Sequence, residues 1–95
     1  MARRHVVQIS KLAQKQIKRL PRHIQGALEL WKDLIQTEGV QAIKNIPGYH
    51  DESLMGNRRG QRSCRLSRSY RVIYEELDSD EINIILVLEV NKHDY

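Results

Sequence analysis

The spacing of apolar residues changes from helical to strand-like in the middle of this chain of 95 residues, and that change constrains the fold more than any other feature of the sequence. Between residue 11 and about residue 46, apolar side chains recur every three or four positions, as they do along one face of a helix. From residue 61 onward they alternate with polar residues or form short apolar runs, which is typical of strands. We therefore expect an α+β domain, with a helical hairpin packed on one face of a small, mainly antiparallel sheet.

The first half of the chain predicts two helices. Ser10 is suited to cap a helix over 11–20, and Pro21 ends that helix. Proline is also favoured at the start of a helix, so Pro21 can open a second one over 22–39. One further helical turn can follow at 40–46. The second helix has a single apolar stripe, which predicts its buried face: Ile24, Leu28, Trp31, Leu34 and Ile35.

Four segments are predicted to be strands: 5–10, 61–67, 69–76 and 82–91. The two middle segments are separated by a short turn, so we expect them to pair as antiparallel neighbours. The last segment has an unbroken apolar centre, which predicts a strand in the middle of the sheet with both faces buried. Proline and glycine pairs predict loops between the helices and the later strands.

Composition narrows the class of protein. With 40% hydrophobic and 29% charged residues, residues 1–95 have the composition of a single globular domain. No apolar run is long enough to cross a bilayer, and the N-terminus lacks the apolar stretch of a secretion signal. Cys64 is the only cysteine, which predicts a cytosolic protein in which Cys64 is a small buried residue. No nucleotide-binding, zinc-binding or other metal-binding motif is present, so we expect no cofactor and no metal.

Cationic residues are concentrated in two runs that no acidic residue interrupts. The net charge is +4, from 16 Lys and Arg against 12 Asp and Glu. One run lies in the first 22 residues, and the other contains only arginine. Arginine makes forked contacts with phosphate, so the runs favour a nucleic acid or another polyanion as partner over a merely solvated surface. The second run comprises Arg58, Arg59, Arg62, Arg65, Arg68 and Arg71.

Strand alternation predicts where candidate site residues point. Arg65 and Arg71 each lie on the polar face of their own strand. If the last strand continues to the end of the chain, Asn91, His93 and Tyr95 also share one face. If these faces coincide, the cations and the terminal residues converge on one surface of the sheet, and the helical hairpin covers the other.

Such a surface fits metal-independent cleavage of RNA, in which the 2′-OH attacks the neighbouring phosphate. The reaction needs a general base, an acid and cations that stabilise the phosphoryl oxygens. His93 titrates near neutral pH, and Glu52 could act as a base. Arg65 and Arg71 could hold the phosphate, while Tyr95 could stack on a base, orient the phosphate or donate a proton.

These residues also have ordinary structural interpretations. His93 can be an exposed residue near the end of the chain, and Tyr95 can cover the edge of the sheet. Either Glu52 or Asp51 can pair with a neighbouring arginine. The two strand arginines can balance acidic residues across the sheet.

The segment 52–74, together with the last four residues, resembles the RelE/ParE superfamily of toxins from bacterial type II toxin–antitoxin systems. The similarity is greatest to the HigB-like and YoeB-like mRNA interferases. The order of elements, with a helical hairpin before the sheet, is similar over nearly the whole chain. The residues that carry the resemblance are Glu52, Leu54, the loop Gly56-Asn57-Arg58-Arg59-Gly60, Ser63-Cys64-Arg65, Tyr70-Arg71-Val72-Ile73-Tyr74 and Lys92-His93-Asp94-Tyr95.

The resemblance implies a RelE-like microbial ribonuclease fold and a ribosome-dependent endoribonuclease that cuts mRNA and inhibits translation until an antitoxin neutralises it. The implied catalytic residues are Glu52, Arg65, Arg71, His93 and Tyr95. The base position varies among family members, and this chain ends in His-Asp-Tyr rather than an adjacent His-Tyr pair. The acid and base roles therefore stay open among Glu52, His93, Asp94 and Tyr95.

The implied partners are a cognate antitoxin, ribosomal RNA and mRNA, within a toxin–antitoxin hetero-oligomer and without a membrane. Expected contacts to RNA or the ribosome are Arg58, Arg59, Arg62, Arg68 and Lys92. Two alternatives remain: ParE-like relatives share the fold but inhibit DNA gyrase by binding, and an inactive member would bind only its antitoxin.

Overall fold

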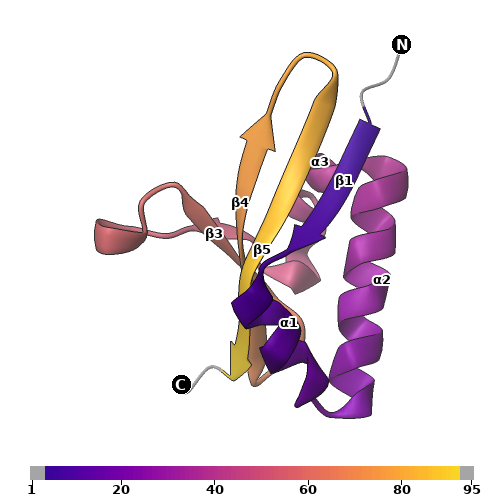
Figure 1. The fold of residues 1–95 in the computed structure, drawn as a ribbon, viewed down its shortest axis with the longest axis vertical. Helices are drawn as coiled ribbons and strands as arrows, with labels where there is room; N and C mark the ends of the chain where they lie inside the picture. The colour runs from indigo at the N-terminus through magenta and orange to yellow at the C-terminus, as the bar shows by residue number, and fades with distance from the viewer. Residues whose placement is uncertain (1–3, 93–95) are drawn as a thin grey trace.

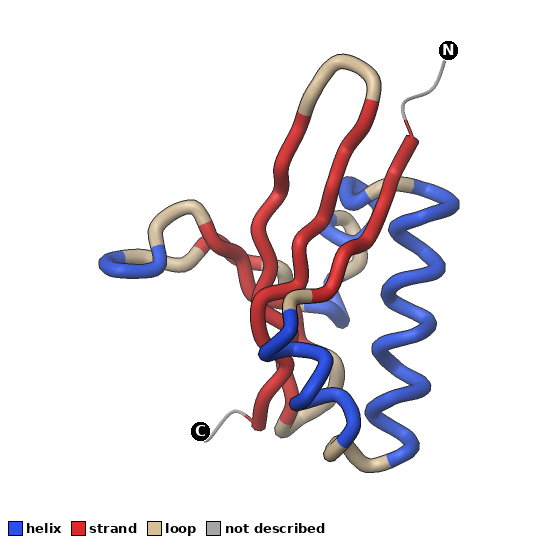
Figure 2. Tube along the Cα trace, in the orientation of Figure 1, coloured by secondary structure: helices blue, strands red, loops and turns tan. Residues whose placement is uncertain are grey.

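The computed structural model describes residues 4–92, which form three helices on one side of a five-stranded sheet (Figures 1 and 2). The expected α+β class is confirmed. His93, Asp94 and Tyr95, three of the candidate site residues, lie outside the described residues. The elements are β1 (Arg4–Ile9), α1 (Lys11–Lys18), α2 (Arg22–Glu38), α3 (Val40–Lys44), η1 (Pro47–Tyr49), β2 (Glu52–Ser53), η2 (Gly56–Arg58), β3 (Gln61–Arg65), β4 (Tyr70–Asp78) and β5 (Ile82–Lys92).

The sheet has the strand order β1-β5-β4-β3-β2. Only the β1–β5 pair is parallel, and the other three pairs are antiparallel, as the sequence predicted for a mainly antiparallel sheet. The prediction that both faces of β5 are buried is wrong. Its side chains are fully buried on the face toward the helices, whereas Ile82, Ile84 and Leu86 on the other face are only partly buried, because the helices cover one face alone.

The helix boundaries follow from local capping. The backbone N–H of Ala13 donates to Ser10 Oγ at 3.1 Å, which is the predicted cap of α1. Pro21 precedes the first residue of α2, and Gly39 ends that helix with φ at 87°. A Cβ at Gly39 would lie 2.9 Å from a ring carbon of His5, so this end of the helix needs glycine for space as well as for backbone conformation.

The core lies between the helices and one face of the sheet. Trp31 of α2 contacts Tyr74 of β4 edge to face, with ring centroids 5.7 Å apart, and both side chains are fully buried. The predicted apolar stripe of α2 is confirmed, with Leu34 at its partly buried margin. No helix within residues 4–92 combines the length and hydropathy needed to span a membrane. The opposite face of the sheet is left open for a site.

Candidate functional site on the open face of the sheet

Two arginines and an asparagine form one row across the open face. Arg65 pairs with Arg71 between β3 and β4, and Arg71 pairs with Asn91 between β4 and β5. Paired residues in a sheet point to the same side. The next row, Cys64, Val72 and Val90, is buried in the core, so the arginine row faces away from the helices. The predicted coincidence of faces is therefore confirmed for the described residues.

Glu52 lies in a neighbouring row on the same face. It pairs with Ser63, which is two residues before Arg65 along β3. The row continues through Ile73 to Glu89 of β5. A shift of two residues is about 7 Å along a strand, and adjacent strands are about 4.8 Å apart, so the long side chains of Glu52 and Arg65 can reach one bound group.

The loop between β2 and β3 also contributes to this face. Arg58 Nη1 lies 2.7 Å from Glu89 Oε2, and Asn91 Nδ2 donates to the other oxygen of the same carboxylate at 3.2 Å. Arg58 is thus held by an ion pair next to the arginine row. Arg59, Arg68 and Lys92 are exposed, and their expected contacts to RNA remain predictions.

Arg71 carries an unsatisfied donor. Its Nε is buried and has no hydrogen-bond partner within residues 4–92. A buried donor without an acceptor is unfavourable by about 1–3 kcal/mol. A bound phosphate would supply acceptors in the plane of the guanidinium, which suits the role that the sequence predicted for Arg71.

On the helix-covered side of the same part of the sheet, the buried carboxylate of Asp51 accepts hydrogen bonds from three side chains. The Asp51 side chain is fully buried, and Arg62 donates to its Oδ1 through Nε at 2.6 Å. Cys64 Sγ donates to Oδ2 at 2.9 Å, and the hydroxyl of Tyr74 donates to the same oxygen. Arg62 also donates to Ser53 Oγ at 2.7 Å. We call Asp51, Ser53, Arg62, Cys64 and Tyr74 the Asp51 cluster.

The Asp51 cluster bears on the predictions for Arg62 and Cys64. The contact of Arg62 with RNA stays a prediction. Alternation places Arg62 beside Cys64 on the face toward the helices, where Asp51 holds its guanidinium. Burial lowers the pKa of Arg62, but the hydrogen bond and charge of Asp51 outweigh it, so the pKa is raised. Cys64 is buried, as predicted. Burial first, and the hydrogen bond to Asp51 second, raise the pKa values of Cys64 and Tyr74.

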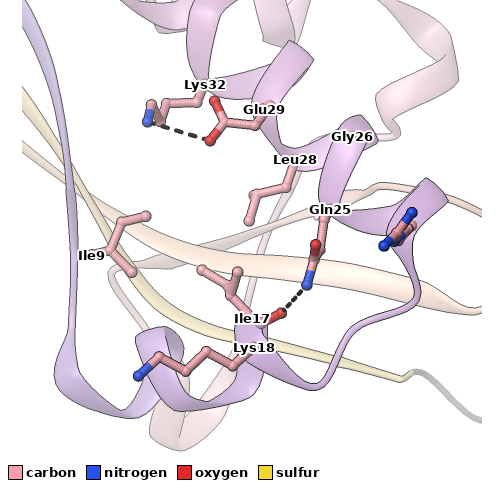
Figure 3. A pocket seen from close by; sticks show the side chains of 9 residues that line it. Ile9, Ile17, Lys18, Gln25, Gly26, Leu28, Glu29 and Lys32 are labelled. Carbon is pink, nitrogen blue, oxygen red and sulfur yellow. Dashed lines mark hydrogen bonds and ion pairs between the residues drawn. The ribbon is translucent and has the colours of Figure 1, made fainter.

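A second feature, a groove of about 510 Å³, lies between α1, α2 and β1 (Figure 3). Ile9, Ile17 and Leu28 form its apolar lining, and Gln25 Nε2 donates to the carbonyl of Ile17 at 2.9 Å across the helix pair. The basic residues at the groove belong to the cationic run of the first 22 residues and to the middle of α2. They are Lys18, Arg22 and Lys32. Two features of the sequence could have indicated this groove. One is Gly26, which has no side chain to fill the space, and the other is the absence of acidic residues between residues 1 and 25.

The α+β fold is shared with solved structures of small toxins. YafQ from E. coli strain BL21(DE3) superposes with a TM-score of 0.72 at 14% identity, covering 93% of this chain and 92% of YafQ. A YoeB/ParE toxin from Agrobacterium tumefaciens gives 0.70 at 16%, covering 94% and 99%. The archaeal RelE–RelB complex from Pyrococcus horikoshii OT3 gives 0.69 at 24%, covering 93% of each chain. Among curated protein sequences, none matches the chain.

The family follows from the sequence. The family model described as "ParE toxin of type II toxin-antitoxin system, parDE" matches residues 7–94. The chain therefore belongs to the ParE toxin family, within the RelE/ParE superfamily that the resemblance indicated.

Proposed function

We propose that the protein is a ribosome-dependent endoribonuclease toxin that cleaves mRNA by attack of the 2′-OH, without a metal ion. The observation that supports this most directly is the row of Arg65, Arg71 and Asn91 on the open face, with Glu52 in the neighbouring row. This arrangement combines two phosphate-binding cations with a carboxylate, which are groups that 2′-OH attack requires.

In this proposal, Arg65 and Arg71 bind the non-bridging phosphoryl oxygens and stabilise the charge that develops on them. Glu52 lies where a base could take the proton of the 2′-OH, and its exposed side chain can reach a sugar bound beside the phosphate. His93 and Tyr95 follow β5, whose last described residues adjoin the arginine row. They are proposed as acid and as stacking or orienting group, with Asp94 the alternative.

The exposed cations would bind the ribosome and the RNA backbone in the cytosol. Arg59, Arg68 and Lys92 lie around the arginine row or in the adjacent loops, and Arg58 adjoins it. Contacts of this kind weaken steeply as salt rises, because each phosphate contact releases condensed counterions.

The proposed partner of the groove between α1 and α2 is an acidic, amphipathic segment of a cognate antitoxin. The groove is lined by apolar side chains and bordered by Lys18, Arg22 and Lys32, with Glu29 as the acidic exception, 3.6 Å from Lys32. An amphipathic helix with acidic flanks would complement both properties. Solved complexes exist for relatives of the same fold, including DinJ–YafQ from E. coli and RelB–RelE from P. horikoshii.

A second function is favoured by the family match itself. The matching model describes ParE toxins, and the resemblance to ParE-like members implies inhibition of DNA gyrase by binding. If the protein inhibits gyrase by binding, it needs no catalytic role for Glu52, Arg65 and Arg71. Shared fold does not decide between the two functions, because function resides in the site.

Primer extension on a translated mRNA, after brief induction of the toxin, tests the proposal. We expect new 5′ ends within the reading frame for the wild type, weakened by about 100-fold or more in Arg71→Ala and clearly weakened in Glu52→Gln and His93→Ala. Arg4→Ala, which removes one cation from β1 at the far side of the sheet, is the matched control and should cleave normally.

Intact mRNA together with arrested growth would contradict the nuclease proposal. Inhibited gyrase supercoiling that is insensitive to His93→Ala would then support the gyrase alternative. Antitoxin binding without either activity would identify an inactive member.

A further inference from the structure

The strand that carries Glu52 is too short to hold itself in place. β2 has two residues, and its ladder to β3 consists of two positions, Glu52 with Ser63 and Ser53 with Arg62. Strands usually have 3–10 residues, and an edge strand is paired on one side only. The position of the Glu52 carboxylate must therefore depend on contacts other than the ladder.

Both chain neighbours of Glu52 are anchored beneath the sheet by one guanidinium. Asp51 accepts from Arg62 Nε at 2.6 Å and lies 2.5 Å from its Nη2, while Ser53 Oγ accepts from Nη1 at 2.7 Å. Successive side chains of an extended segment point to opposite faces. With Asp51 and Ser53 drawn to the helix-covered side, Glu52 is directed to the open face, where the arginine row lies.

The contact between Asp51 and Arg62 is supported by buried side chains. Cys64 and Tyr74, which donate to Asp51, are fully buried, and the ring of Tyr74 packs against Trp31. His50, immediately before Asp51, adopts a left-handed backbone conformation with φ at 46°. A non-glycine residue in this region is held there by its surroundings, and the buried Asp51 is the adjacent constraint.

We propose that Asp51 is a positioning residue for the nuclease site: acting with Arg62, it places the Glu52 carboxylate over the face that carries Arg65 and Arg71. This inference rests on the proposed ribonuclease function, because it assigns Asp51 an effect on the reaction through Glu52. A positioning residue differs from one that only stabilises the fold. If Asp51 acts through Glu52, substitution of Asp51 has no further effect on the rate once Glu52 has lost its carboxylate.

A double-mutant cycle on the full-length protein tests the inference. Cleavage of a ribosome-bound mRNA would be measured in a purified translation system for the wild type, Asp51→Asn, Glu52→Gln and the double variant. We expect Asp51→Asn to lower kcat by about 10-fold or more, with the KM for the ribosome-bound mRNA unchanged, because a small misplacement of a reacting group reduces the rate strongly. The double variant should be no slower than Glu52→Gln alone.

Two further variants separate positioning from stability. Ile24→Val shortens a fully buried side chain of α2 that lies outside the core cluster containing Cys64 and Tyr74, and it should lower the melting temperature without a comparable loss of kcat. Tyr74→Phe removes one donor to Asp51 and keeps the ring, so it should lower kcat in the same direction by less. Multiplicative losses in the double variant would overturn the inference. So would a loss of kcat in Ile24→Val as large as that in Asp51→Asn, if the two variants have the same melting temperature.

Hydrogen exchange supplies a measurement that does not depend on activity. The amide of Leu54 donates to the carbonyl of Gln61 at 2.9 Å, just after β2. Asp51→Asn should make this amide exchange at least 10-fold faster, while amides in the centre of β4 and β5 keep their protection. Unchanged exchange at Leu54 would overturn the inference even if wild-type cleavage is confirmed. Absence of wild-type cleavage would instead contradict the proposed function.

Discussion

Arg65 and Arg71 occupy directly opposed positions on β3 and β4, so that two positive side chains lie next to each other on the open face of the sheet. Like charges at directly paired positions destabilise a sheet. The buried Nε of Arg71 adds an unsatisfied donor within the described residues. Groups that destabilise the folded state are typical of a functional site. Here a bound anion would reduce the repulsion between the two arginines and accept a hydrogen bond from Arg71 Nε.

The first prediction concerns the opposing effects of Arg71 on stability and activity. Arg71→Gln removes the repulsion with Arg65 while keeping a polar side chain of similar reach. We expect the free energy of unfolding to rise by about 0.5 kcal/mol. Cleavage of mRNA should fall by about 100-fold, since the variant loses the group proposed to stabilise the phosphoryl oxygens. Thermal unfolding and primer extension measure the two effects.

The control for this prediction is Arg4→Gln, which changes the net charge equally but lies on β1, two strands away from β4. It should leave both the melting temperature and cleavage nearly unchanged. A melting temperature several degrees lower in Arg71→Gln would mean that Arg71 stabilises the sheet, contrary to the interpretation that its buried Nε is an unsatisfied donor.

The second prediction concerns stability at alkaline pH. The pKa of the Cys64 thiol is raised in the folded protein, by burial and by the hydrogen bond to Asp51. In the unfolded chain a cysteine releases its proton near pH 8.5, whereas the folded protein retains it. Above that pH the folded state binds more protons than the unfolded state, so the free energy of unfolding falls as pH rises. The limiting slope is about 1.4 kcal/mol per pH unit.

Urea denaturation at several pH values between 8 and 10 measures this slope. Tyr74, whose pKa is also raised, adds a second decrease only above about pH 10, where an unfolded tyrosine ionises. In Cys64→Ala, the slope between pH 8.5 and 10 should flatten, even though the variant is less stable overall. Equal slopes in the wild type and Cys64→Ala would contradict the buried, protonated thiol.

The third prediction tests the groove between α1 and α2 as the surface for the antitoxin. A Cβ at Gly26 would meet nothing within 4 Å. Gly26→Ala should therefore stabilise α2 by about 1 kcal/mol, which corresponds to a melting temperature about 4–8 °C higher. Gly26→Glu would place a long carboxylate in the groove, and it should weaken antitoxin binding by about 10-fold or more while leaving mRNA cleavage unchanged.

Calorimetric titration of each variant with the cognate antitoxin measures binding. Gly26→Ala serves as the matched control, because it alters the same position without filling the groove. Gln36→Glu adds the same charge at an exposed position of the same helix, away from the groove. Wild-type affinity in Gly26→Glu would show that the antitoxin binds elsewhere.

Some features of the site could be predicted from the sequence, and others could not. The alternation that placed Arg65 with Ser63 also requires Arg62 to lie with Cys64, so its orientation toward the helices was predictable. The prediction that Arg62 binds RNA rests on its place in the run of arginines and does not use the alternation of side chains along the strand. Asp51 was recognised only as one of two acids that could pair with an arginine, and its burial beneath β2 depends on Tyr74, more than 20 residues later.

The sequence by itself determined the helices, four of the five strands and the face of each of those strands on which a side chain lies, because these depend on residues two to four positions apart. The two-residue strand β2 lies in a segment predicted to be a loop. The sequence also determined the family, through the motif between residues 52 and 74. Only the tertiary structure decided that Arg65, Arg71 and Asn91 fall into one register, and that Arg62 holds Asp51 and Ser53 on either side of Glu52. These relationships join segments distant in the chain, and their geometry is set by how the strands pair and pack against the helices.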